Sequence, residues 1–227
     1  MTKPFAASKI KLNRANQHIA ELKRVLVQYF VGNPPSIAYT AAADPDVQFS
    51  LNAVGPPECV GAIVGDVVHN LRAALNLMAV ELVEMNGGAA TNTKGVCFPF
   101  CDHADNLDSM IKRRHFHRAG IEAVRLLQEI KPFTGGNAAL RALHDLDIQD
   151  KHNSLIPNVL TMTSQEFTVD WSIPSPVFQV VEGSTPSFTV VFPDESPLAG
   201  SEIVPALHEL VELVIGILEK FAILPRS

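Results

Sequence analysis

The sequence predicts an α+β protein: a helical bundle with a β-hairpin insertion and an antiparallel β-meander before the C-terminal helix. Three observations predict this class. Long segments space their apolar residues three and four apart, two segments alternate apolar with polar residues, and strands and helices show no regular βαβ alternation. We expect a single domain over residues 1–227, with the helical bundle in 5–31, 57–86, 104–152 and 202–224 and the β parts in 36–53 and 158–193.

The first helix and the hairpin follow from a change of period. Apolar residues recur every three or four positions from Leu12 to Tyr29, and Gly32 with the prolines after it ends the helix. From Val47 to Asn52 the apolar residues alternate with polar ones, and the Asp-Pro-Asp turn at 44–46 joins this strand to the one before it.

The longest helical pattern runs from Gly55 to Asn86 and has two distinct sides. The apolar side is continuous, whereas Asp66, His69, Asn70, Arg72 and Asn76 gather on the other side. Leu77 and Val80 lie among these polar residues, so we expect the polar side to be half buried against another element.

Shorter elements fill the second half of the chain. An extended piece at 96–100 precedes short helices at 106–113, 120–130 and 137–150. Alternation returns after Asn158, with turns at 174–176 and 183–186, and predicts an antiparallel meander of three or four strands. Apolar residues from Leu207 to Phe221 then step by three and four in the final helix.

Composition limits the class of protein. Hydrophobic residues make up 47% of the 227 residues, enough for a large core, and the net charge of −6 argues against a surface that wraps nucleic acid. The N-terminus lacks an apolar leader, and no uncharged stretch reaches about 18 residues, so we expect no membrane partner. Three cysteines favour a reducing compartment, and we expect a cytoplasmic protein.

Two polar motifs carry the candidate site. In the long helix, Asp66 precedes His69 by one turn and Arg72 follows it, a spacing that suits acid–base chemistry next to an anion site. In the later helix, Asp150 and His152 flank the expected helix end. The candidate catalytic residues are Asp66, His69, Arg72, Asp150 and His152, and the candidate ligand-binding residues are Asn70, Asn76 and Lys151. The alternative is a polar network that fixes helix packing.

A metal site receives less support from the spacing. The second motif also contains His144 and Asp147, but no recognised metal-ligand pattern is present. Cys97, Cys101 and His103 invite a zinc interpretation, yet the residues between the cysteines read as a buried strand, which favours free thiols. We therefore predict no metal and no other cofactor.

A basic run interrupts the acidic chain at residues 112–118. Lys112, Arg113, Arg114 and Arg118 surround Phe116, a combination that suits phosphate or single-stranded RNA contact. Such runs are more often solvated loops, so nucleic acid is expected as a partner only through this patch.

The motifs resemble those of an uncharacterised family of bacterial and phage-associated proteins. The resemblance covers about residues 12–155 and rests mainly on Gly65-Asp66-x-x-His69-Asn70-Leu71-Arg72-x-Ala74-Leu75 and on Asp150-Lys151-His152. The family usually has Asp where this chain has Asn76. Because the family has no established activity, the resemblance implies a fold and two polar motifs but no reaction.

Two functions remain open from the sequence, and whether the protein is an enzyme is left undecided. The favoured one is an interaction or binding module whose polar motifs are mainly structural. The alternative is an enzyme or ligand binder acting on a phosphate-containing or RNA substrate at a His/Arg/Asp site, and such a substrate would suit Arg72, Lys151 and the basic run at 112–118. In either case Asp147 or Asp150 is expected within reach of His69 or Arg72.

The last helix also bears on assembly. Its residues Leu213, Ile215, Ile217 and Ile223 are interpreted as lying off the main apolar stripe. This apolar surplus predicts a homodimer formed through this helix or the first one.

Overall fold

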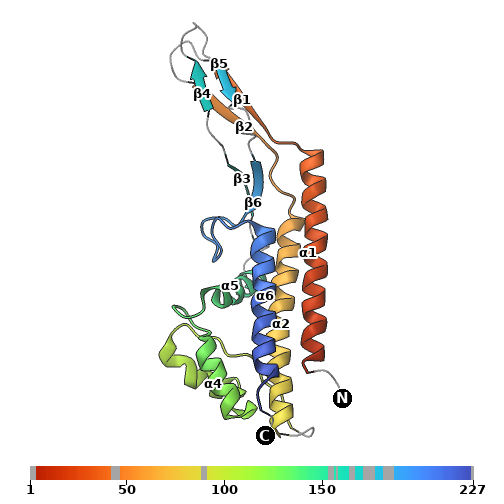
Figure 1. The fold of residues 1–227 in the computed structure, drawn as a ribbon, viewed down its shortest axis with the longest axis vertical. Coiled ribbons are helices and arrows are strands. Elements are labelled where there is room, and N and C mark those ends of the chain that lie inside the picture. The colour runs from red at the N-terminus through yellow and green to blue at the C-terminus, as the bar shows by residue number, and fades with distance from the viewer. Residues whose placement is uncertain are drawn as a thin grey trace.

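Long helices and short β-ribbons make up the described chain. The computed structural model describes residues 4–41, 47–87, 91–152, 156, 158–163, 167–170, 177–180 and 187–225. The helices are α1 (Ala6–Gly32), α2 (Cys59–Gly87), α3 (Leu107–Arg113), α4 (Ile121–Ile130), α5 (Ala138–His152) and α6 (Ile203–Ala222). The strands are β1 (Ser36–Ala41), β2 (Val47–Asn52), β3 (Val159–Thr163), β4 (Phe167–Asp170), β5 (Val177–Val180) and β6 (Ser187–Val191). Figure 1 shows the strands beyond one end of the long helices and both termini near the other end.

Helices α1, α2 and α6 form the bundle, and each buries the apolar stripe that the sequence predicts. On α1 the buried stripe includes Leu12, Ala15, Ile19, Leu22 and Tyr29. Helix α2 is buried along most of its length because α1, α5 and α6 all pack on it. These helices share one continuous hydrophobic core.

Helices α3, α4 and α5 lie to one side of the bundle (Figure 1). Single 3-10 turns at Ala104–Asn106 and Phe116–Ala119 precede and follow α3. Leu140, Leu143 and Leu146 of α5 are fully buried, which confirms the apolar cover expected for the polar side of α2. The predicted extended piece at 96–100 has no regular strand, although Cys101 forms an isolated parallel bridge with Phe133.

The strands form antiparallel pairs whose order differs from a meander. β1 pairs with β2, which confirms the predicted hairpin. After α5, however, β3 pairs with β6 and β4 pairs with β5, so the pairing is nested rather than sequential. Alternation of apolar and polar residues identifies a strand but not its partner, which is why the meander prediction was wrong in its pairing. The predicted continuation of β4 through 171–173 lies outside the described residues.

The α+β helical class is confirmed, and the surplus apolar surface of α6 is smaller than predicted. Ile217 is 3% exposed and belongs to the core, and Leu213 and Ile215 are partly buried against it. Ile223 is 83% exposed. The difference arises because α6 packs against α1, α2 and α5 rather than against one neighbour. None of the helices in the described residues combines the length and apolar character that crossing a lipid bilayer requires.

Candidate functional site

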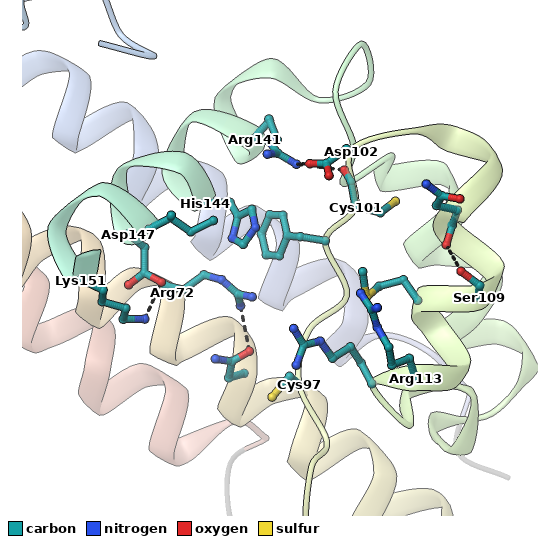
Figure 2. Close-up of a pocket in the computed structure, with 16 residues that line it drawn as sticks. Arg72, Cys97, Cys101, Asp102, Ser109, Arg113, Arg141, His144, Asp147 and Lys151 are labelled. Carbon is teal, nitrogen blue, oxygen red and sulfur yellow. Dashed lines mark hydrogen bonds and ion pairs between the residues drawn. The ribbon is translucent and has the colours of Figure 1, made fainter. Parts of the chain in front are cut away.

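A pocket of about 710 Å³ lies between α2, the segment 97–102, α3 and α5. Figure 2 shows its charged side chains converging from these elements. Its cationic lining residues are Arg72, Arg113, Arg114, Arg141 and Lys151, and its acidic lining residues are Asp102 and Asp147. The pocket is thus basic in a chain whose net charge is −6.

Arg72 is the most buried of these cations, with 9% of its surface exposed. Its Nη1 donates to Asn76 Oδ1 (2.8 Å) and its Nη2 donates to the Phe98 carbonyl oxygen (3.3 Å). Its Cζ lies 4.2 Å from the centroid of the Phe100 ring, a cation–π distance. All three partners are neutral.

The charge of Arg72 is not paired with a carboxylate in the part of the chain that the structure describes. Burial lowers its pKa to about 10, Asp147 opposes that shift, and Arg114 adds to it by repulsion. The guanidinium therefore remains cationic at neutral pH, in a place where a bare cation is costly.

Asn76 ties Arg72 to the wall of the pocket. Its Oδ1 accepts from the Phe98 backbone N–H (3.1 Å) as well as from Arg72. One amide oxygen thereby fixes both the guanidinium and the segment that carries Phe100.

The charges of Arg141 and Lys151 are compensated within the fold. Arg141 pairs with Asp145 (2.7 Å) and Asp102 (2.9 Å), and its hydrogen bond to Asp145 chiefly raises its pKa. Lys151 Nζ lies 2.6 Å from Asp147 Oδ2. Arg72, Arg113 and Arg114 are then the lining cations without a carboxylate partner among the described residues.

His144 completes the wall beside Phe100. The two rings stack with centroids 4.4 Å apart and an interplanar angle of 13°. Burial, together with repulsion from Arg72 and Arg141, lowers the pKa of His144 to about 4, so the imidazole is neutral at pH 7. Its Nδ1 has no hydrogen-bond partner within the described residues.

The two predicted polar motifs meet at the α2–α5 contact. His69 Nδ1 lies 3.6 Å from Asp147 Oδ1, which confirms the expected proximity. Asp150 packs on the backbone of Gly65, and burial, with Asp147 and Asp66 nearby, raises its pKa.

The predicted residues separate into two groups. Arg72, Asn76 and Lys151 line the pocket, whereas Asp66, His69, Asn70 and Asp150 do not. Asp66 approaches His18 of α1 (4.0 Å), and Asn70 accepts from Lys11 (3.3 Å) and donates to the Asp66 carbonyl oxygen (2.7 Å). The side chain of His152 lies outside the described residues.

The basic run at 112–118 does not present one continuous surface. Arg113 and Arg114 line the pocket, Arg118 donates to the Asn92 carbonyl oxygen (2.7 Å), and Lys112 is exposed. The sequence grouped this run with Arg72 and Lys151 as contacts for a phosphate-containing substrate, and in the structure Arg113 and Arg114 line one pocket with both residues.

Sequence reasoning also left Phe100, Asp102 and Arg141 out of the site. Arg141 lies one turn before Asp145 on α5, a spacing that marks an ion pair but not a pocket. Phe100 has an apolar signal that is equally typical of a core residue.

No metal-binding arrangement is present among the described residues, where no three His, Cys, Asp or Glu side chains cluster suitably. All three cysteines are free thiols, and the Cys101 thiol donates to the His103 carbonyl oxygen (3.2 Å). Burial raises the pKa of Cys101.

No protein-family model, curated protein or solved structure matches this chain. The family resemblance therefore stays a prediction from the motifs.

Proposed function

We propose that this protein binds a phosphate-containing small molecule in the basic pocket. The observation that carries the proposal is Arg72, a buried guanidinium whose partners are all neutral. Burial of a cation without an ion pair is unfavourable, and the attraction of Asp147 offsets only part of that cost. An anion seated against Arg72 would supply the missing counter-charge.

The hydrogen-bonding capacity of Arg72 supports the same ligand. A guanidinium has five N–H groups, and the two bonds to Asn76 and Phe98 use two of them. The planar donors suit the paired oxygens of a phosphate, which accept two parallel hydrogen bonds.

The shape and charge of the pocket agree with a small ligand. Its volume of about 710 Å³ falls among ordinary small-molecule sites. Its excess of cations contrasts with the acidic chain and concentrates anions locally. RNA is less favoured, because Arg113 and Arg114 line the pocket and Arg118 is bonded to Asn92.

Binding, rather than catalysis, is what the lining side chains support. Ser109 Oγ donates to the Asn106 carbonyl oxygen (2.8 Å), and the Cys101 thiol donates to that of His103. Neither of these two groups is thus bonded to a general base, as an activated nucleophile would be, and Cys97, the other lining thiol, has no hydrogen bond to a base among the described residues. In this proposal the contact of His69 with Asp147 is structural.

Two further expectations accompany this proposal. Three free thiols support a cytoplasmic location, since an oxidising compartment favours disulfides. A homodimer through α1 or through the end of α6 is supported by exposed apolar side chains: Val27 (62% exposed) and Val31 (78% exposed), one turn apart on α1, and Ile223 (83% exposed) after α6.

The test is a titration of the ¹⁵N-labelled protein with inorganic phosphate, followed by NMR. We expect saturable shifts in residues around Arg72, a loss of affinity of about tenfold or more in Arg72→Gln, and no loss in Lys112→Gln. Lys112 is a matched control because it is a nearby exposed cation that does not line the pocket. Absence of saturable binding in the wild-type protein would refute the proposal.

A further inference from the structure

The unpaired cations of the pocket lie on two different walls. Arg72 projects from α2, whereas Arg113 ends α3 and Arg114 follows it. Figure 2 shows Arg72 and Arg113 on opposite sides of the hollow. A ligand that satisfies both walls needs anionic groups at two places.

The wall formed by Arg113 and Arg114 is free to take an anion. Arg113 Nη2 contacts only the sulfur of Met110 (3.1 Å), a weak acceptor, within the described residues. Arg114 has no ion pair there, and both side chains are exposed. Neither arginine would have to leave a carboxylate to bind a ligand.

The two walls also interact electrostatically. Arg114 lies near enough to Arg72 to disfavour its charged form by like-charge repulsion, after burial as the main cause. One anionic group placed between them relieves this repulsion, but a single phosphate at Arg72 leaves the cations of α3 largely uncompensated.

From this arrangement we infer that the ligand carries a diphosphate group, with one phosphate at Arg72 and the next toward Arg113 and Arg114. The inference rests on the proposed function and specifies its ligand class. Each phosphate carries between one and two negative charges near pH 7, so a diphosphate matches three arginines better than a monophosphate does. The remaining volume of the pocket accommodates the organic part of the ligand.

The experiment compares inorganic pyrophosphate with inorganic phosphate as probes of the whole protein. We expect pyrophosphate to bind about tenfold more tightly or better. Arg113→Gln and Arg114→Gln should each lower pyrophosphate affinity by about threefold or more and change phosphate affinity by less than about twofold. Lys112→Gln should alter neither, which separates a specific contact from the loss of one positive charge. All three side chains are exposed, so the variants are expected to fold.

Each other outcome has a definite meaning. Equal affinities for the two probes would overturn the diphosphate inference and leave the proposed phosphate site intact. A pyrophosphate preference that persists in both arginine variants would also overturn it, because the second phosphate would then lie elsewhere. Failure of both probes to bind would refute the proposed function and the inference with it.

Discussion

The backbone of Gly65 in α2 lies directly against the carboxylate of Asp150 in α5. A Cβ atom at position 65 would come within 2.7 Å of Asp150 Cγ and closer still to its Oδ1. Position 65 therefore has no room for a side chain while Asp150 keeps its place.

Gly65→Ala should consequently destabilise the protein. Glycine to alanine inside a helix normally stabilises by about 1 kcal/mol. Here the added methyl group displaces Asp150, and overpacking of this kind costs about 1–3 kcal/mol. In an Asp150→Ala background the same substitution should become stabilising, because the carboxylate is gone. Urea unfolding of the wild type, the two single variants and the double variant shows whether Gly65→Ala raises or lowers the free energy of unfolding in each background.

Gly216 provides the control for this comparison. It lies within α6, and a Cβ there would meet no atom within 4 Å. Gly216→Ala should stabilise by about 0.5–1 kcal/mol in either background. If Gly65→Ala behaves like Gly216→Ala in the wild-type protein, the close approach to Asp150 is wrong.

The long helices could be predicted from the sequence because each buries a stripe of apolar residues that repeats every 3.6 positions. Leu12 and Ile19 of α1 and Leu210 and Val214 of α6 are core residues, as their spacing predicts. The pairing of the strands could not be predicted from the sequence. Alternation of apolar and polar residues does not show whether β3 pairs with β6, as observed, or with β4.

The candidate site was predictable only in part. The helical spacing identified Arg72 and Asn76, which lie one turn apart and are hydrogen-bonded. Charge alone grouped the basic run with Arg72 for a phosphate ligand, and only the packing of the fold singles out Arg113 and Arg114 and places them in one pocket with Arg72. The same spacing favoured His69 and Asp150, which instead form the contact between α2 and α5.

Self-association is open to direct measurement. The exposed apolar residues Val31 and Ile223 lead us to expect a homodimer at micromolar concentration. Light scattering should then give twice the mass of the 24.6 kDa chain. Val31→Lys and Ile223→Lys should shift the protein toward the monomer, and a wild-type monomer at this concentration would contradict the expectation.

Arg72→Ala should lower stability. The substitution leaves the Phe98 carbonyl oxygen without its donor and removes packing on Phe100. An unsatisfied buried acceptor costs about 1–3 kcal/mol, and relief of the unfavourable burial of the charge offsets part of it, so we expect a net loss of about 1 kcal/mol. Lys112→Ala, at an exposed position, should change stability by no more than about 0.5 kcal/mol. Thermal unfolding of both variants tests this, and equal melting temperatures would show that Arg72 has no structural role.

His144 should make stability depend on pH. Its pKa is about 4 in the folded protein and 6.5 in an ordinary environment, because burial and the charges of Arg72 and Arg141 disfavour the imidazolium. The unfolded chain therefore binds more protons between these values, and stability rises with pH over this window. At pH 5 unfolding should take up about 0.9 proton at this residue.

The variant His144→Phe isolates this contribution. Phenylalanine can still stack on Phe100 but does not titrate, so the slope of stability against pH should fall by nearly one proton near pH 5. Asp150, whose pKa is raised mainly by burial, acts in the opposite direction and is common to both proteins. Urea unfolding at intervals from pH 4 to pH 7 measures the difference. Identical slopes would place the imidazole in contact with solvent.

Asn76→Asp should weaken anion binding without unfolding the protein. The carboxylate can accept from Arg72 Nη1 and from the Phe98 N–H as the amide oxygen does, so the local hydrogen bonds are preserved. The carboxylate also brings a negative charge next to the Arg72 guanidinium, which then needs no counter-charge from a ligand. Phosphate affinity should fall about tenfold or more, equivalent to about 1.4 kcal/mol.

The control for this variant adds the same charge elsewhere. Asn13→Asp lies on an exposed part of α1, outside the lining of the basic pocket, and should change phosphate affinity by less than about twofold. Phosphate titration and thermal unfolding of both variants separate a local effect from a change in net charge. Unchanged phosphate affinity in Asn76→Asp would mean that the anion does not bind at Arg72. A specific loss would mark Asn76 as a residue that leaves Arg72 free for its ligand.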